Sequence, residues 1–228
     1  MGDLIDTTEM YLKTVYELEE DGVTPLRARI VDRLGHSGPT VSQTVARMER
    51  DGLLHVLGDR RLELTPEGRA RAVEVMRKHR LAERLLLDVI GLGWGEIHDE
   101  ACRWEHVMSD QVEASLTTLL HGPKVDPFGN PIPGTGAEFT GQSAEVASRA
   151  GDEVDVRVVR IGEPIQADLA LIREFERADI RPGTPVRMVN AQGEMWLTPL
   201  DGEGGPLDVA PVELPGALRP HLFVEAIG

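Results

Sequence analysis

The sequence of 228 residues has few of the features that mark secreted or membrane proteins. Its single cysteine, Cys102, excludes an internal disulfide and is typical of a reducing compartment. No apolar run approaches the roughly 20 residues that a membrane-spanning helix needs, and the N-terminus lacks the basic-then-apolar pattern of a signal peptide. Aromatic residues make up only 4% of the chain, so we expect an aliphatic core. These features predict a soluble, cytoplasmic protein without a membrane partner.

Positive charge is also scarce: the chain has 24 lysines and arginines but 39 acidic residues, which gives a net charge of −15. Such a chain has no global attraction for nucleic acids. The charge is uneven, however: residues 27–71 contain nine arginines and six acidic residues, a local charge of +3. A local basic patch is compatible with DNA binding, since steering depends on the nearby field. An arginine-rich surface exposed only to solvent would have the same composition.

Residues 1–73 have the pattern of a winged helix-turn-helix domain. A helix start at Asp6 is followed by a short helix over 26–34, a breaker-rich turn over 35–39, a further helix, and two strands within 53–64. In such a domain the second helix of the pair enters the major groove and the hairpin contacts the DNA backbone. The pattern therefore predicts DNA binding, although helix-turn-helix segments also occur as plain packing motifs.

The helix after this turn has one apolar and one polar face. Val41, Val45 and Met48 recur at the spacing of a buried helix face. Hydroxyl, amide and guanidinium groups, which read base edges and phosphates, occupy the outer face. This outer face consists of Thr40, Ser42, Gln43, Arg47 and Arg50.

Residues 74–140 are expected to form a helical domain, with helices over 66–90, 96–109 and 111–120. An apolar stripe wide enough for a packed core or a dimer contact comprises Leu81, Leu85, Leu86, Val89 and Ile90. Eight of the residues 121–140 are glycine or proline, which predicts an irregular arm.

The remainder of the chain changes character. Residues 141–151 show no strong period and are expected to form a flexible linker. Within 152–228, the alternation of Val154, Val156 and Val158 and several short strand-like pieces predict a small β-barrel with one helix near 166–178. The fold class is therefore a multidomain α+β protein with a winged helix-turn-helix, an all-helical domain and a small barrel.

Metal-binding side chains are concentrated on the middle helices. His79 and Glu83 are four residues apart and share one helix face. A second stripe, at offsets of 0, 4, 7 and 8 residues, consists of His98, Cys102, Glu105 and His106. Nitrogen, oxygen and sulfur ligands of this mix suit a divalent transition metal, and a lone cysteine argues against a zinc finger. The same spacing occurs on solvated helices, so spacing alone leaves the site open.

Five segments are long enough to be characteristic of a protein family: Asp6–Leu12, Ser37–Val45, Met76–Glu83, Glu100–Ser109 and Pro127–Gly134. They resemble the diphtheria toxin repressor / iron-dependent regulator family. The resemblance is continuous from residue 3 to about residue 134. It is weaker over the C-terminal domain, which is similar to the SH3-like domain of that family mainly in pattern.

The resemblance implies two metal sites in each subunit. An activating site would use Met10, Cys102, Glu105 and His106. An ancillary site would use His79, Glu83 and His98, completed from the third domain by Glu163 and Gln166. The implied metal is Fe²⁺, with Co²⁺, Ni²⁺, Mn²⁺ or Zn²⁺ as possible substitutes in vitro.

The function implied by the resemblance is that of a homodimeric, iron(II)-activated repressor of iron-acquisition genes. It would bind double-stranded operator DNA that carries an inverted repeat, and it would have no small-molecule substrate. Gln43 is the expected base-reading residue. The other expected DNA contacts are Arg27, Ser37, Pro39, Thr40, Ser42, Arg47, Arg50 and Arg60.

Three alternatives remain. The first is a manganese-responsive repressor of the same family, and the second is a DNA-binding module that needs no metal. The third is a metalloenzyme, since an open His/Glu site can activate water. The sequence has no HExxH motif and no obvious spare general base, which argues against an enzyme.

Overall fold

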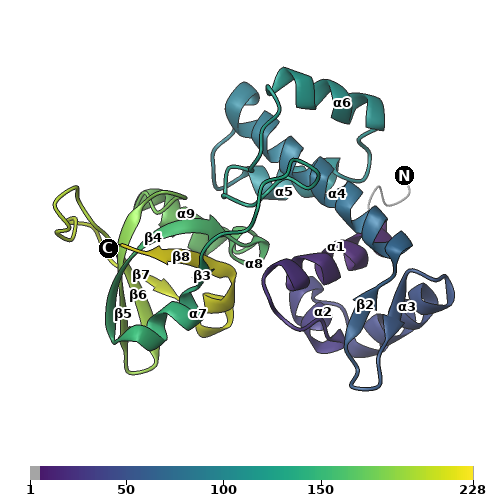
Figure 1. Cartoon of the computed structure of the whole chain (residues 1–228), viewed down its shortest axis with the longest axis horizontal. Helices are drawn as coiled ribbons and strands as arrows, with labels where there is room; N and C mark the ends of the chain where they lie inside the picture. The colour runs from purple at the N-terminus through teal and green to yellow at the C-terminus, as the bar shows by residue number, and fades with distance from the viewer. Residues whose placement is uncertain (1–5, 228) are drawn as a thin grey trace.

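The computed structural model describes residues 6–227 and arranges them in three units (Figure 1). Residues 1–5 and 228, which belong to the expected first and last domains, lie outside the described residues. The first unit contains α1 (Thr7–Glu20), α2 (Arg27–Leu34), α3 (Gly38–Arg50), β1 (Leu54–Val56) and β2 (Leu62–Leu64). This order confirms the winged helix-turn-helix expected from the sequence.

Local signals explain the helices of the first unit. Asp6 caps α1, because its side chain accepts hydrogen bonds from the backbone of Thr8 and Glu9. Gly35 ends α2 in the left-handed region, with φ of 66°. Ser37 then caps α3 by accepting from the backbone N–H of Thr40. These caps fix where α3 begins, so its buried face meets the core of the unit and its polar face stays exposed.

The second unit is helical and consists of α4 (Pro66–Leu85), α5 (Ile97–Trp104) and α6 (Asp110–Leu119). The helix predicted to reach residue 90 changes at Leu85 into one π-helical turn, Leu86–Ile90, which Gly91 ends. The helix predicted over 96–109 ends five residues early. The backbone N–H groups of Val107 and Met108 both bond to Trp104, and Ser109 caps the next helix.

The third unit is built on a six-stranded antiparallel sheet in the order β3-β8-β4-β5-β6-β7. Its strands are β3 (Gln142–Ser143), β4 (Glu153–Ile161), β5 (Pro185–Ala191), β6 (Glu194–Pro199), β7 (Val212–Leu214) and β8 (Leu222–Ala226). Its helices are α7 (Ala144–Ala147), α8 (Glu163–Gln166) and α9 (Leu169–Arg177), with 3-10 turns over Ser148–Ala150 and Gly216–His221. The expected small β-domain is confirmed.

One expectation for this part of the chain is corrected. The segment 141–151 is no flexible linker: β3 pairs with β8, and the side chains of Ala144 and Ala147 are buried in the core. The helix expected near 166–178 is confirmed as α9, which Asp168 caps by accepting a hydrogen bond from the backbone of Leu171, and the short helix α8 precedes it.

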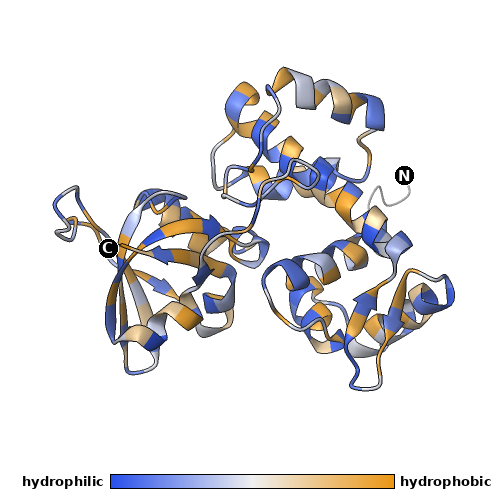
Figure 2. Ribbon diagram, in the orientation of Figure 1, coloured by the Kyte–Doolittle hydropathy of each residue, from blue (hydrophilic) through white to orange (hydrophobic). Residues whose placement is uncertain are grey.

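Apolar residues recur along the helices and strands of each unit, as the orange segments of Figure 2 show, and many of them are buried. One core fills the first unit and includes Ala72 from the start of α4. A second core runs continuously from the helical unit into the third unit, and the glycine- and proline-rich arm links them through Phe128. The ring centroids of Phe128 and Trp94 lie 4.7 Å apart, and the backbone carbonyl of Phe128 accepts a hydrogen bond from the backbone N–H of Ile161. None of the described helices is long and apolar enough to cross a membrane.

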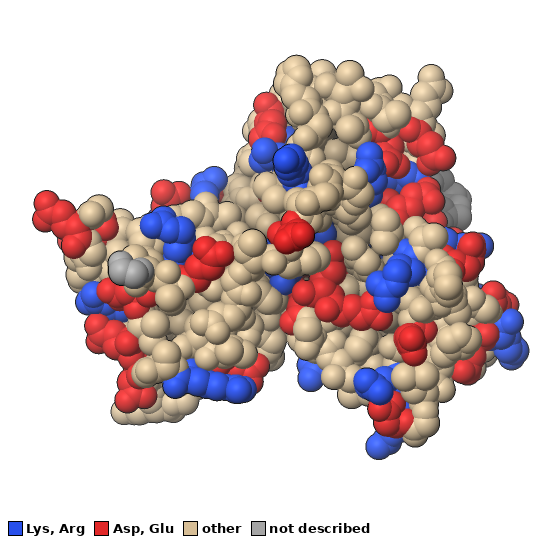
Figure 3. All heavy atoms as spheres, viewed as in Figure 1, with Lys and Arg blue, Asp and Glu red and all other residues tan. Residues whose placement is uncertain are grey.

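Charged side chains are distributed over all three units, and acidic ones gather along the seam between the first and third units in the view of Figure 3. At this seam Asp21, at the end of α1, accepts from Arg160 over 2.7 Å. Its other oxygen lies 2.6 Å from Nδ1 of His221. The guanidinium of Arg160 also stacks over the ring of Phe223, 3.5 Å from its centroid. These contacts hold the third unit against the first helix of the DNA-binding unit.

Candidate metal centre

The metal-binding side chains predicted from the sequence come together where the three units meet. They are carried by α1 of the first unit, α4 and α5 of the second and α8 of the third, which lies close to α1 and α4 in Figure 1. We call this group of nine residues the donor cluster. It comprises Met10, His79, Glu83, His98, Cys102, Glu105, His106, Glu163 and Gln166.

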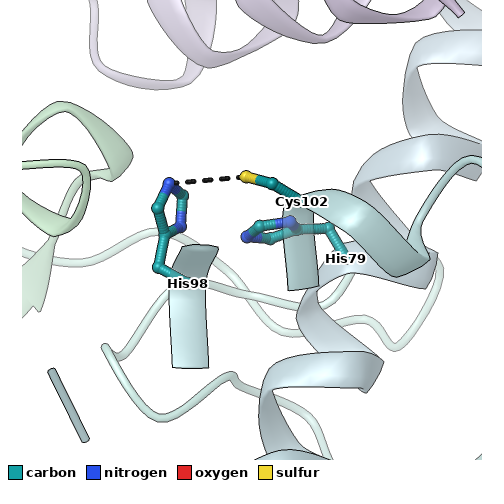
Figure 4. A group of neighbouring side chains, drawn as sticks. All are labelled: His79, His98 and Cys102. Atoms are coloured by element: carbon teal, nitrogen blue, oxygen red, sulfur yellow. Dashed lines mark hydrogen bonds between the residues drawn. The ribbon is translucent and has the colours of Figure 1, made fainter. Parts of the chain in front are cut away.

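Three side chains at the centre of the cluster have the spacing of metal ligands. His79, His98 and Cys102 each place one donor atom so that all three lie within 4.8 Å of one another. The two imidazole rings meet edge to face with centroids 4.9 Å apart. Nε2 of His98 lies 3.7 Å from Sγ of Cys102, the contact drawn in Figure 4. Nitrogen and sulfur donors at this spacing can bind one divalent cation.

Carboxylates join these donors into one network. Oε1 of Glu83 lies 2.9 Å from Nε2 of His79 and 3.3 Å from Nδ1 of His98. Nδ1 of His79 lies 2.6 Å from Oε2 of Glu105. His79 belongs to the ancillary set implied by the resemblance and Glu105 to the activating set. The structure therefore places the two sets in direct contact.

Glu163 and Gln166 approach the cluster from the third unit, and both are buried. Oε2 of Glu163 lies 3.9 Å from Nε2 of His79, whereas Gln166 donates its amide to the carbonyl of Ile161. Among the described residues, three buried oxygens have no hydrogen-bond partner: Oε2 of Glu83, Oε1 of Gln166, and Oε2 of Glu163, which has only an ion-pair contact of 3.5 Å with Lys13. Buried acceptors without a partner cost free energy. All three belong to the ancillary set, which fits a cation bound beside them.

A cavity of about 200 Å³ lies between α1 and α5. Met10, Cys102, Glu105 and His106 all line it. Nε2 of His106 lies 3.2 Å from Oε1 of Glu105, and its Nδ1 lies 2.7 Å from a carboxylate oxygen of Glu9. The structure thus brings the four residues of the activating set to one cavity, with a thioether, a thiolate, a carboxylate and an imidazole available as donors.

The charges of the cluster favour the ligating forms of its acidic groups. Burial opposes ionisation of Cys102, yet the charges of His98 and Lys13 hold the pKa of its thiol well below the usual range. Burial likewise opposes ionisation of Glu105, but Lys13 and then His79 lower its pKa to about 2. Burial is the largest single influence on the pKa of His98 and lowers it, but the Cys102 thiolate and the Glu83 carboxylate together outweigh burial and raise that pKa to about 9. The thiolate and the carboxylate are the forms that bind metals.

One residue of the site was missed by sequence reasoning. Lys13 is buried, and its Nζ lies 2.8 Å from Oε2 of Glu105 and 3.1 Å from Nδ1 of His79. A signal for it exists in the sequence, because Lys13 follows Met10 by three residues and so shares its face of α1. A lysine at that spacing is equally common on a solvated helix face.

Two family models match the chain. The description "Iron dependent repressor, N-terminal DNA binding domain" covers residues 3–62, and "Iron dependent repressor, metal binding and dimerisation domain" covers residues 65–134. The chain belongs to the iron-dependent repressor family. It is a transcriptional repressor rather than an enzyme, and the second model spans the donor residues on α4 and α5.

Named relatives agree with this assignment. The diphtheria toxin repressor of Corynebacterium glutamicum is 57% identical over 205 residues, which cover 87% of this chain and 90% of that protein. The iron-dependent repressor IdeR of Mycobacterium tuberculosis is 56% identical over 202 residues, 85% of this chain and 88% of that protein.

Two solved structures are also similar to this chain over almost its whole length. A manganese-dependent transcriptional repressor in complex with manganese has a TM-score of 0.78 and 27% identity and covers 97% of this chain and 100% of that one. ScaR with bound Zn²⁺ has a TM-score of 0.76 and 26% identity, with coverage of 97% and 100%.

The DNA-facing residues predicted for the repressor lie on or beside α3 and on the hairpin. Eight of the nine are exposed: Ser37, Pro39, Thr40, Ser42, Gln43, Arg47, Arg50 and Arg60. Arg27, at the start of α2, is half-buried and lines one hollow together with Arg60 of the hairpin. Arg27 and Arg60 are the first and last residues of this set in the sequence, yet in the structure they line the same hollow.

Proposed function

We propose that this repressor is activated by iron(II), acts as a homodimer on operator DNA in the cytoplasm, and controls iron-acquisition genes. One observation carries the proposal: α1 of the DNA-binding unit supplies Met10 to a cavity whose other donors, Cys102, Glu105 and His106, lie on or just after α5. The position of the DNA-binding unit is therefore tied to the state of these donors.

The mechanism follows from which helix carries each donor. A divalent cation in this cavity would join α1 to α5 through its ligands. Met10 moves with α3 as part of one folded unit, so a fixed Met10 also fixes the recognition helix relative to the dimer. Ligand binding that favours one arrangement shifts the population toward it, and coupling of this kind is typically worth about 1–3 kcal/mol.

The donor types favour iron over manganese. Met10 offers a thioether and Cys102 a thiolate, and soft donors favour Fe²⁺ and later metals, whereas Mn²⁺ prefers carboxylate and water oxygens. We propose two metal sites per subunit: the activating set of Met10, Cys102, Glu105 and His106, and the ancillary set of His79, Glu83, His98, Glu163 and Gln166. Co²⁺, Ni²⁺, Zn²⁺ and Mn²⁺ are expected to substitute in vitro. Relatives named as iron-dependent support this choice.

Dimerisation is supported by apolar side chains that remain exposed on the helical unit. Val89 and Ile90 of the π-helical turn are 56% and 54% exposed, and Val107, which follows α5, is 55% exposed. Exposed apolar groups of this kind mark interaction sites. A two-fold symmetric dimer would present two copies of α3, which is the reason to expect an inverted repeat in the operator.

On the DNA, Gln43 is proposed to contact a base, because a side-chain amide can bond adenine bidentately. Ser37, Pro39, Thr40 and Ser42 would supply further contacts near the start of α3. Phosphates would be met by Arg27, Arg47, Arg50 and Arg60.

The proposal is tested by anaerobic DNA-binding titrations. A duplex is first selected from a random library in the presence of Fe²⁺, and its anisotropy is then followed with Fe²⁺, with Mn²⁺ and with a chelator. We expect tight binding with Fe²⁺, a weaker response to Mn²⁺ and loss of specific binding with chelator. Equal binding with and without chelator would support the metal-independent module instead.

A further inference from the structure

The ammonium group of Lys13 lies inside the donor cluster. Its side chain is about 6% exposed. Besides Glu105 and His79, its Nζ approaches Oε2 of Glu163 at 3.5 Å and Sγ of Cys102 at 3.8 Å. These four partners belong to the proposed ligand sets, two to each set. No other lysine approaches any of these four groups among the described residues.

We propose that Lys13 is the resident cation of the metal centre: it competes with a divalent metal for Glu105 and Cys102 and so sets the metal concentration at which the repressor responds. This inference rests on the proposed metal-dependent function. It assigns to Lys13 a role distinct from that of a ligand, because an ammonium group has only donors and cannot bind a metal.

Lys13 and a metal ion would compete for Glu105 for steric and electrostatic reasons. Nζ of Lys13 lies 2.8 Å from Oε2 of Glu105, and a divalent transition metal binds a carboxylate oxygen at roughly 2.0–2.2 Å. Two cations at these distances from one oxygen would lie close together and repel each other strongly in a buried site. An ammonium group that stays on Glu105 therefore weakens the binding of a metal ion to that carboxylate.

The arginines at this junction have different partners. Arg80 donates to Glu20 and to Oε1 of Glu163. Arg33 donates to Glu17. Neither guanidinium is paired with Glu105 or with the Cys102 thiolate in the described structure. Besides the imidazoles of His79 and His98, which belong to the ligand sets themselves, Lys13 is thus the cation whose removal leaves these two ligands of the activating set with less compensating charge.

Another acidic side chain lies within reach of the ammonium group of Lys13. Glu17 lies one turn farther along α1, and its Oε1 is 3.8 Å from Nζ of Lys13. Both residues line the cavity of about 200 Å³ beside α1. Glu17 belongs to neither proposed ligand set. A small rotation of the Lys13 side chain toward Glu17 would release Glu105 without exposing the charge or unfolding α1.

The test compares Lys13→Met with a matched control, Lys78→Met, in the full-length protein. Lys78 is also a buried lysine, but its ammonium group pairs with Glu74 and Asp110, neither of which belongs to the donor cluster. Binding of Co²⁺ is measured by titration calorimetry and by the absorbance of the cobalt–thiolate complex. Removing a unit charge at about 4 Å is expected to lower the Co²⁺ dissociation constant at least tenfold. The Lys78 variant should stay within about threefold of the wild type.

Thermal unfolding gives a second readout. In chelator, Lys13→Met should unfold at a lower temperature than the wild type, because its carboxylates lose a partner. Co²⁺ should then raise its unfolding temperature more than it raises that of the wild type. Lys13→Gln removes the charge while it keeps a polar side chain, and it serves if the methionine variant does not fold.

The possible outcomes separate this inference from the proposed function. A folded Lys13→Gln variant with unchanged or weaker Co²⁺ affinity would overturn the role of Lys13 as a competitor, and the repressor proposal would stand. A wild-type protein that binds no Co²⁺, Fe²⁺ or Mn²⁺ would overturn the metal-dependent function itself. Tighter binding in Lys13→Met and unchanged binding in Lys78→Met would support the inference.

Discussion

Nδ1 of His79 and Oε2 of Glu105 lie 2.6 Å apart, so the proposed ancillary and activating sets share a direct contact. Two sets that contact each other cannot respond independently, since the position of one donor constrains the other. His98 of the ancillary set, 3.7 Å from Cys102 of the activating set, provides a second contact of this kind. The metal centre is therefore one connected network that joins α1, α4, α5 and α8.

This contact predicts non-additive effects on metal affinity. His79→Ala and Glu105→Ala each remove a donor, and residues in contact typically show coupling energies of roughly 0.5–3 kcal/mol. A double-mutant cycle on Co²⁺ binding by calorimetry measures the coupling. The matched pair is His79→Ala with Gln43→Ala, whose effects should add because Gln43 lies on the exposed face of α3. Additive effects for His79 and Glu105 would argue for two independent sites.

Metal affinity should rise with pH between 7 and 9. Burial lowers the pKa of His98, but the Cys102 thiolate and the Glu83 carboxylate together raise it to about 9, so the ring is protonated at pH 7. The proton must leave before the nitrogen can bind a metal. Calorimetry in buffers of different ionisation enthalpy should detect proton release at pH 7 and less release at pH 9. A constant affinity from pH 7 to 9 would show that His98 is not a ligand.

The raised pKa of His98 also affects the stability of the metal-free protein, but in the opposite direction: this contribution to stability falls as pH rises. A histidine whose pKa is raised on folding stabilises the folded state most below its unfolded value of about 6.5. That contribution from His98 is lost as pH rises through about 9. Urea unfolding in chelator should therefore show this contribution declining between pH 6.5 and 9. His98→Asn should weaken that part of the pH dependence.

Base reading and phosphate contact are separable on α3. Gln43→Ala should weaken binding to the selected duplex more than binding to random DNA, because base contacts specify the sequence whereas phosphate contacts mostly position the protein. Arg47→Ala or Arg60→Ala should weaken both and reduce the salt dependence. Anisotropy titrations over a salt series measure these effects. Equal losses on both duplexes for Gln43→Ala would exclude a base-reading role.

The preference for iron should depend on the two soft donors. Met10→Asp combined with Cys102→Glu replaces a thioether and a thiolate with carboxylates, which suit Mn²⁺. Anaerobic DNA-binding titrations should then show a larger response to Mn²⁺ relative to Fe²⁺ than in the wild type. Circular dichroism establishes whether the variant is folded. An unchanged ratio in a folded variant would contradict the selectivity argument but not the repressor function.

Elements with a local signal could be predicted from the sequence. Asp6 and Ser37 cap helices through their own side chains, and Val41, Val45 and Met48 repeat at helical spacing. These features depend on residues close in the chain, so the winged helix-turn-helix followed from them. His98 and Cys102 are likewise one turn apart on α5, which explains why spacing alone made them candidates.

Features that depend on distant contacts could not be predicted in the same way. The segment 141–151 is too short to show a period, and its order comes from pairing of Gln142 with Val224 and burial of Ala144. The position of Lys13 depends on how α1 packs against α4 and α5. The contact between His79 and Glu105 likewise depends on tertiary packing, so the sequence could assign donors without showing that the two sets touch.

The central claim is that metal binding and operator binding favour the same arrangement of α1 against α5. It is tested most directly by a thermodynamic cycle measured anaerobically: the operator affinity with and without Fe²⁺, and the Fe²⁺ affinity with and without operator. We predict that each ligand tightens binding of the other by the same factor, about 5–150-fold. We also predict that Met10→Ala brings this factor close to one, while Fe²⁺ still binds the remaining donors. A factor near one in the wild type, or an unchanged factor in Met10→Ala, would contradict the account.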